Sequence, residues 1–177
     1  MSDYLNCRKI KEINAFLNSW LEEQGFECTV QYDNDFSFDF VNDVIHYSFI
    51  VCDLHDKLFE EVCKSCNPDI VNVDNFVLSF FHELGHFNTL HIFNEKEWKS
   101  YEELNEVLNN KLKNNKDENV EKKLYNQYYI YPIELEATQW GCDYIVSHSD
   151  EVEKFFNKFQ ELYKEFLKDN NYEFDQC

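Results

Sequence analysis

The sequence predicts an α+β fold in which a small antiparallel sheet packs on a predominantly helical domain. Three glycines and two prolines in 177 residues are too few for a turn-rich β-sandwich or barrel. The period of a half-buried strand appears over residues 26–52, where polar residues separate Phe36, Phe38 and Phe40. From there to the end of the chain the apolar residues recur at helical spacing.

A first helix is expected before the sheet. Its apolar residues recur on one helical face: Ile13, Phe16, Leu17, Trp20 and Leu21. Gly25 follows as the expected C-terminal stop. The strand segments come next, and Asn34-Asp35 and Asn42-Asp43 supply the turns between them.

Further helices are expected after the sheet. A short one ends near Asn67-Pro68 and has four apolar residues on its face: Leu54, Leu58, Phe59 and Val62. A longer helix covers roughly residues 74–92 with Asp74 as its N-cap. Residues 95–130 are charged and rich in asparagine, which predicts one or two surface helices. Pro132 then opens a helix to about residue 147, and residues 150–169 form the last amphipathic helix.

The chain is strongly acidic. Sixteen lysines and arginines against 35 aspartates and glutamates give a net charge of −19. Such a surface repels phosphate backbones and anionic membranes, so we expect neither direct nucleic-acid binding nor membrane binding. Two interpretations of the charge stay open: a solvated surface that maintains solubility, and an acidic face that attracts a basic partner or mimics DNA.

Seven cysteines, an odd number, are spread along the chain. The N-terminal residues lack the apolar region of a secretory signal, and no apolar run approaches the ~20 residues of a membrane span. We therefore expect a cytoplasmic protein whose cysteines are small buried hydrophobes. Cys63 and Cys66 form a single C-x-x-C pair with no second pair and no βαβ context, so core packing is favoured over a metal or redox site.

The motif that carries chemistry is HELGH, from His82 to His86 on the long helix. Histidines four residues apart project from the same side of a helix, so both imidazoles can bind one Zn²⁺ at about 2.0–2.1 Å. Glu83 can then act as general base on a water that the metal activates. Apolar residues within and beside the motif predict a buried helix: Phe80, Phe81, Leu84 and Phe87. Buried histidines need partners, which a metal supplies, and the alternative is two satisfied histidines on a charged face.

Glu134 is the predicted third ligand. Ala137 and Gly141 follow it at i+3 and i+7, and this stripe of small residues lets its helix pack closely on Gly85 of the HELGH helix. Glu136 is rotated by about 200° from Glu134 and is the weaker alternative. Either glutamate could instead simply complement the helix N-terminus. A metal other than zinc, such as Mn²⁺, also stays open.

Other histidines and tyrosines are weaker candidates. His46 on a strand and His148 after the Glu134 helix could steady an oxyanion, whereas His91 lies off the ligand stripe and is expected to be packed or at the surface. Four tyrosines flank the Glu134 helix, and one of them could donate its hydroxyl to a tetrahedral intermediate. They are Tyr128, Tyr129, Tyr131 and Tyr144.

The order of sheet, HELGH helix, spacer and P-x-E-x-x-A-x-x-W helix resembles the ImmA/IrrE family of zincin-like metallopeptidases. The resemblance covers about residues 30–147. Its specific parts are the HELGH motif and the segment from Pro132 to Trp140. The family implies a single zincin-like (minimal gluzincin) metallopeptidase domain over residues 1–177, in which the long spacer is a helical insertion at about 95–130.

The resemblance also implies a set of site residues. Zinc would bind His82, His86 and Glu134, with Glu83 as the base. The related pattern has an aspartate four residues after the glutamate ligand to hold a histidine ligand. Thr138 occupies that position here and is a weaker acceptor.

Members of the family act on regulators, so the resemblance implies a specific protein substrate, such as a transcriptional repressor. An extended substrate would lie against VIHYSFIVC (residues 44–52) as an edge strand. The first hypothesis is thus a zinc-dependent endopeptidase. The alternative is a non-catalytic acidic zincin-fold binding protein, an antagonist or DNA mimic in phage–host or mobile-element regulation. A housekeeping peptidase of broad specificity is a third. The oligomeric state stays open.

Overall fold

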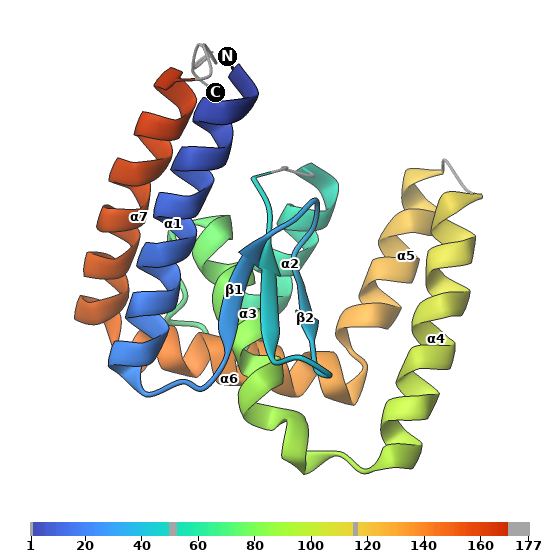
Figure 1. Cartoon of the computed structure of the whole chain (residues 1–177). Coiled ribbons are helices and arrows are strands. Elements are labelled where there is room, and N and C mark those ends of the chain that lie inside the picture. Colours follow the sequence, from blue (N-terminus) through green and yellow to red (C-terminus); the bar gives the residue numbers. More distant parts are fainter. Residues whose placement is uncertain (1, 50–52, 115–116, 170–177) are drawn as a thin grey trace.

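The computed structural model describes residues 2–49, 53–114 and 117–169, and it confirms an α+β fold of helices around a small sheet (Figure 1). The helices are α1 (Ser2–Gln24), α2 (Asp53–Cys66), α3 (Asn75–Thr89), α4 (Glu95–Lys113), α5 (Glu118–Tyr129), α6 (Pro132–Ser147) and α7 (Ser149–Asp169), and the strands are β1 (Thr29–Tyr32), β2 (Ser37–Asp39) and β3 (Val44–Tyr47). None of the described helices combines the length and the apolar character that crossing a bilayer requires.

The helices begin and end close to where the sequence predicts. Gly25, with a φ of +81°, follows the end of α1, and the side chain of Asp74 caps α3 by accepting a hydrogen bond from the amide of Phe76. The helix expected over residues 74–92 ends earlier, at Thr89, and a short 3₁₀ turn continues from Leu90 to Ile92. The spacer forms two helices rather than one, α4 and α5.

The three strands form a mixed sheet in the order β1-β3-β2, so the prediction of an antiparallel sheet is wrong in one pairing. β3 runs parallel to β1, with Val44 opposite Thr29, and antiparallel to β2, with His46 opposite Ser37. The chain crosses from one edge of the sheet to the other between β1 and β2, and then returns into the middle. Apolar alternation says which face of a strand is buried but not which strands are neighbours.

The central place of β3 also corrects the expected edge strand. Residues 44–52 were expected to offer an edge to a substrate, but β3 is paired on both sides, and residues 50–52 lie outside the described residues. β2 is the edge next to α3, and Phe38 of β2 lies with its ring 6.1 Å from that of Phe87.

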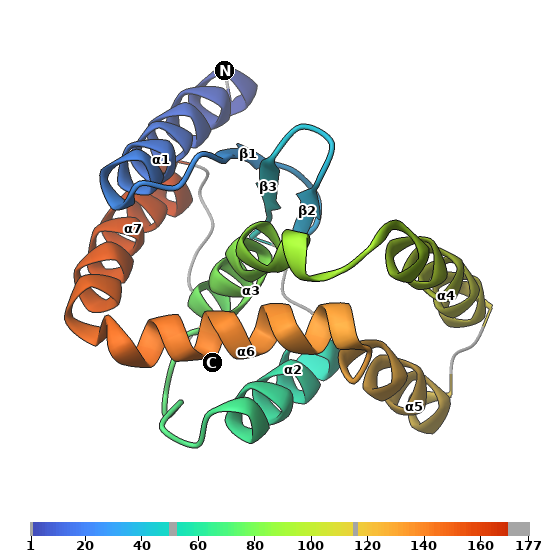
Figure 2. The same cartoon turned by 90° about the horizontal axis from the view of Figure 1, so that it is seen from below.

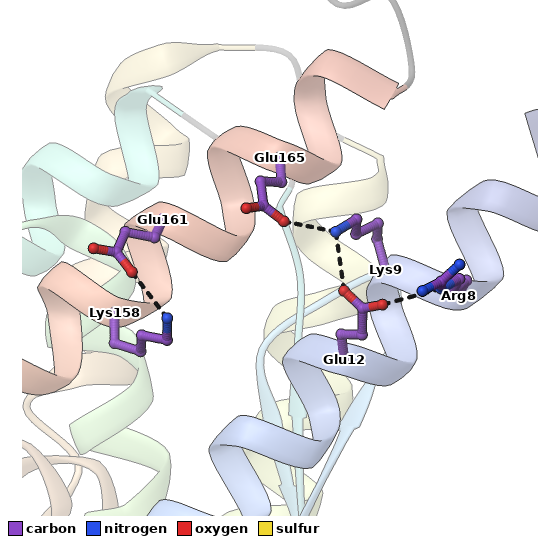
Figure 3. A network of polar contacts seen from close by, with 6 residues as sticks. All are labelled: Arg8, Lys9, Glu12, Lys158, Glu161 and Glu165. Atoms are coloured by element: carbon purple, nitrogen blue, oxygen red, sulfur yellow. Dashed lines mark hydrogen bonds and ion pairs between the residues drawn. The ribbon is translucent and has the colours of Figure 1, made fainter.

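α1 and α7 lie side by side at one end of the molecule (Figures 1 and 2). Large aromatic side chains fill the space between them, since the ring of Phe155 lies 5.7 Å from Phe16 and 4.7 Å from Trp20. At their exposed faces Lys9 Nζ of α1 lies 2.6 Å from the carboxylate of Glu165 on α7 and 3.0 Å from that of Glu12 (Figure 3).

α3 and α6 cross at the centre with their backbones in contact (Figure 2). A Cβ on Gly85 would lie 2.2 Å from the carbonyl oxygen of Ala137, and a Cβ on Gly141 would lie 2.6 Å from that of Phe81. The predicted close approach of the two helices on small residues is therefore confirmed, and only glycine fits at both positions.

α4 and α5 form a helical hairpin on the other side of the molecule from α1 and α7 (Figures 1 and 2). A capping box between Asn94 and Glu97 fixes the start of α4. The residues that the hairpin buries are few: Tyr101, Leu108, Leu124 and Tyr129. The apolar faces of α4 and α5 are therefore small. They pack mostly against each other and against α2.

The C-x-x-C pair belongs to the packing of α2 on α6. Cys63 is buried and Cys66 half-buried, and both are free thiols. The thiol of Cys142 donates to the Cys63 carbonyl at 3.6 Å, while burial raises the pKa of Cys66 to about 11. Three other cysteines, Cys7, Cys52 and Cys177, lie outside the described side chains.

Candidate metal centre

The contact between α3 and α6 brings His82, His86 and Glu134 together. All three are buried, and Glu134 is fully inaccessible to solvent. The Nε2 atom of His82 lies 3.1 Å from Oε2 of Glu134, and that of His86 lies 3.6 Å from Oε1. One ligand atom from each residue lies within 4.8 Å of the others, so this group could hold a metal ion.

Helical geometry explains why Glu134 and not its neighbour faces the histidines. Glu134 lies on the stripe with Ala137 and Gly141 that packs against α3, whereas Glu136 is turned away and exposed. The glycines allow the two backbones to come close enough for short side chains on α3 and α6 to meet.

Thr138 orients His82. Its hydroxyl donates to the backbone carbonyl of Glu134 at 2.7 Å, so its oxygen accepts from Nδ1 of His82 at 3.0 Å. A hydroxyl has one hydrogen, so this arrangement places the imidazole proton on Nδ1. The Nε2 lone pair of His82 is then free to bind a metal, and the weak acceptor expected at Thr138 does contact a histidine of the group.

The polar atoms of the group fit a cation. Oε2 of Glu134 is buried and has no hydrogen-bond partner among the described residues, although Nε2 of His82 lies 3.1 Å away. A carboxylate oxygen that faces an imidazole lone pair at this distance is repelled unless a cation lies between them. Two imidazole nitrogens and one carboxylate oxygen are also the donor set of many catalytic zinc sites.

The electrostatics of the group centre on Glu134. Burial would raise the pKa of its carboxyl, but positive charge on the His86 and His82 imidazoles outweighs burial and holds that pKa well below its ordinary value. A cation bound at the group would supply this positive charge when both imidazoles are neutral ligands. Burial opposes the charged form of His86, yet the Glu134 carboxylate raises the pKa of His86. For Glu83, burial is the largest influence and raises the pKa. The buried carboxylate of Glu134 therefore stays negative, as a metal ligand must.

Glu83 lines a large cleft together with both histidines. The cleft has a volume of about 950 Å³. Its walls come from β2, from the α4–α5 hairpin and from α7, for example at Phe38, Tyr101 and Tyr163. A carboxylate beside two ligand histidines and open to a cleft can exchange protons with a water or substrate held there.

The structure adds a tyrosine that sequence reasoning missed. Tyr101 on α4 donates its hydroxyl to Oε1 of Glu134, and its hydroxyl lies 3.3 Å from that of Tyr128. Tyr101 lies 33 residues before Glu134 in a segment that reads as a solvated surface helix, and no motif marks it. The nearest signal is its place on the apolar stripe of α4 with Leu108.

The four tyrosines predicted near the Glu134 helix have different surroundings. Tyr128 and Tyr129 line the cleft, and the hydroxyl of Tyr129 is hydrogen-bonded to Nε2 of His55, a histidine that sequence reasoning did not single out. Tyr131 lies beside Tyr101, with ring centres 5.7 Å apart. Tyr144 stacks on Trp140 and is not among the residues that line the cleft.

The remaining histidine candidates do not join the group. His46 is on the central strand with Nδ1 3.5 Å from Asp33, His148 stacks on Tyr144 beyond the end of α6, and His91 is exposed. None of the three lines the cleft.

Comparisons with known proteins give no relative for this chain. No family model matches the sequence, and neither the curated proteins nor the solved structures contain a match. The resemblance to ImmA/IrrE peptidases therefore has no independent support, and a functional proposal rests on the geometry of the site.

Proposed function

We propose that this protein is a zinc-dependent endopeptidase. The observation that carries the proposal is the buried group of His82, His86 and Glu134, at a cleft lined by Glu83. One carboxylate oxygen of this group has no hydrogen-bond partner among the residues described. Three protein residues are the number that holds a catalytic zinc, whereas a structural zinc has four.

The chain's own residues would divide the reaction between them. A zinc ion held by His82, His86 and Glu134 would supply Lewis-acid activation of water and of the scissile carbonyl. Glu83 takes a proton from the attacking water and passes it to the leaving amine. Thr138 keeps the His82 imidazole in the tautomer that presents Nε2 to the ion.

The cleft suggests how a substrate would bind. β2 is an edge of the sheet, and Ser37 and Phe38 of this strand line the cleft. An extended polypeptide could pair with this edge while its side chains enter the cleft. We propose that the substrate is a specific protein, such as a transcriptional regulator, and that it pairs with the edge strand β2 and not with residues 44–52.

The compartment proposed is the cytoplasm. Cys28, Cys63, Cys66 and Cys142 are free thiols, and no disulfide is found among the described residues. Unpaired buried cysteines suit a reducing environment. We also propose that the single domain extends over residues 1–177 with residues 95–130 as a helical insertion.

A second candidate function is an acidic zincin-fold binding protein that acts without catalysis. The net charge of −19 favours it, because a strongly negative surface attracts basic partners and can imitate DNA. Here Glu83 would have no catalytic task, so substituting it would leave the biological effect intact.

Substitution of Glu83 tests the proposal. We expect wild-type protein with zinc to cleave only a small, sequence-related subset of a mixed-sequence peptide library, because the proposed substrate is a specific protein. Glu83→Gln should reduce this cleavage by about 10³-fold or more because the proton carrier is lost. Mass spectrometry of the products measures cleavage, and metal analysis confirms that Glu83→Gln keeps its zinc. Undiminished cleavage by Glu83→Gln, or no zinc-dependent cleavage by the wild type, contradicts the proposal.

A further inference from the structure

The two oxygens of the Glu134 carboxylate have different surroundings. Oε1 accepts the hydrogen bond from Tyr101 and lies 3.6 Å from Nε2 of His86. Oε2 has no hydrogen-bond partner in the part of the chain that the structure describes, and it faces Nε2 of His82. The carboxylate is buried completely, so water cannot satisfy Oε2 from the surface. One oxygen is thus held by the protein and the other is left for a cation.

A chain of hydroxyl groups points toward Oε1. The single hydroxyl hydrogen of Tyr101 goes to Glu134, so the contact with Tyr128 at 3.3 Å has Tyr128 as donor and Tyr101 as acceptor. Tyr101 is 9% exposed, so water has little access to compete for this hydrogen bond. Hydrogen bonds in such a chain reinforce one another in a buried site.

The donor comes from an element that otherwise touches the metal-binding helices little. Tyr101 lies on α4, whose main packing partner is α5, and the hairpin reaches the rest of the molecule chiefly through α5 (Figure 2). The Tyr101–Glu134 hydrogen bond therefore links the hairpin to the centre of the α3–α6 contact.

We propose that Tyr101 is a positioning residue of the metal centre, which holds Glu134 through Oε1 so that the carboxylate binds the ion through Oε2 alone. The inference rests on the metal-binding part of the proposed function and does not require peptidase activity. It also makes the α4–α5 hairpin part of the metal centre. Because coupling between two events is reciprocal, an ion that favours the held carboxylate also favours the docked hairpin.

Zinc affinity tests the role of Tyr101. Tyr101→Phe removes the hydroxyl and keeps the ring, and we expect its zinc affinity, measured by competition with a chromophoric chelator, to fall about 10–100-fold. Tyr128→Phe removes the second donor of the chain and should have a smaller effect. Tyr131→Phe is the matched control, because its ring lies beside Tyr101 but its hydroxyl is not bonded to Glu134, and its affinity should equal that of the wild type.

Hydrogen exchange supplies a readout that does not depend on affinity or activity. Zinc at saturating concentration should slow amide exchange in the first half of α4 in the wild type, and this protection should be much weaker in Tyr101→Phe. Circular dichroism establishes that each variant is folded. A zinc-bound structure should show Glu134 bound through one oxygen and Tyr101 on the other.

The outcomes separate the two proposals. If the wild type binds zinc and Tyr101→Phe binds it equally well, the role of Tyr101 is wrong and the metal centre stands. A zinc-bound structure in which both Glu134 oxygens bind the ion would also contradict the proposed role of Tyr101. If the wild type binds no zinc, both the proposed function and this inference fall.

Discussion

The two helix pairs of this molecule, α3–α6 and α1–α7, are held together in opposite ways. In α3–α6 the backbones touch at Gly85 and Gly141, and the contact encloses histidines and a glutamate. In α1–α7 large side chains such as Trp20 and Phe155 separate the backbones, and the charges lie in exposed ion pairs (Figure 3). The size of the residues at a contact thus decides whether short polar side chains from two helices can meet.

Substitutions in the two helix pairs should therefore have different effects on stability and on metal binding. The α1–α7 pair buries apolar surface, and none of its described residues belongs to the metal group, so its substitutions should change the free energy of unfolding and not zinc affinity. The α3–α6 pair must hold three ligand atoms within 4.8 Å of one another, so its substitutions should change metal binding as well.

The largest expected effect on stability lies in the α1–α7 pair. Leu17 on α1 is fully buried in the apolar core, so Leu17→Ala should lower the free energy of unfolding by about 4 kcal/mol through lost burial and a residual cavity. Urea denaturation measures this change. Zinc affinity of the folded variant should stay within about twofold of the wild type, and a large loss of affinity would show that the two pairs are not independent.

Gly85→Ala should lower both the free energy of unfolding and the zinc affinity. The new Cβ would lie 2.2 Å from the Ala137 carbonyl oxygen, so α3 and α6 must separate. The overpacking cost of up to about 3 kcal/mol exceeds the roughly 1 kcal/mol gained from better helix propensity, so we expect a net loss of about 2 kcal/mol. Zinc affinity should fall more than tenfold, because the ligands lie on the two separated helices.

Gly25→Ala is the matched control for this glycine effect. Gly25 has a φ of +81° but no atom within 4 Å of an added Cβ, so its substitution strains the backbone without moving α3 from α6. Gly25→Ala should lower the free energy of unfolding by about 1 kcal/mol and leave zinc affinity unchanged. If Gly85→Ala behaves like Gly25→Ala, close helix contact does not build the site.

Thr138→Val isolates one hydrogen bond of the α3–α6 pair. The variant keeps the shape of the side chain but leaves the Nδ1 proton of His82 without an acceptor. Zinc affinity should fall about 10–100-fold, as calorimetric titration would measure, whereas Thr138→Ser should retain it. Equal losses in both variants would mean that packing, and not the hydroxyl, matters at this position.

The smallest effect is expected for the ion pairs of Lys9, one of which joins α1 to α7 through Glu165. Hydrogen bonds to Glu165 and Glu12 raise the pKa of Lys9 and lower the pKa of each carboxyl. The raised lysine pKa stabilises the fold until pH rises through it, and the lowered carboxyl pKa values stabilise it until pH falls through them.

Lys9→Met should therefore lower stability slightly between about pH 5 and pH 10, and the difference from the wild type should vanish once the pH falls below the lowered carboxyl pKa values. High salt should shrink it as well, since the Glu165 side chain is 56% exposed. Thermal unfolding over this pH range measures the difference. A difference that persists at low pH would arise from the packing of the lysine stem and not from its charge.

The helices of this fold could be predicted because the spacing of residues within each helical segment is enough to identify it. The spacing of Ile13, Leu17 and Leu21 marks one face of α1, and the position of Glu134 relative to Ala137 and Gly141 identifies the side of α6 that meets α3. Sheet order was not predictable, because three short strands with similar patterns fit several pairings, and β3 takes the centre through a crossover that no local pattern records.

The candidate site shows the same limit. His82, His86 and Glu134 come from a motif and a helical stripe, whereas Tyr101 reaches Glu134 through the tertiary position of the hairpin. From the sequence pattern alone, a tyrosine on the apolar stripe of a charged helix is predicted to be an ordinary core residue. Only the docked structure distinguishes it from its neighbours, which is why functional contacts made across elements escape a sequence reading.

Zinc titration of the metal-free wild-type protein at pH 7 tests the central claim most directly, with Glu134→Gln as its partner variant. The buried group of two histidines and one glutamate predicts that about one equivalent of Zn²⁺ binds per chain and that Glu134→Gln loses most of the affinity. Binding of less than about a tenth of an equivalent by the folded wild type, or full affinity in Glu134→Gln, would contradict a metal centre at the α3–α6 contact.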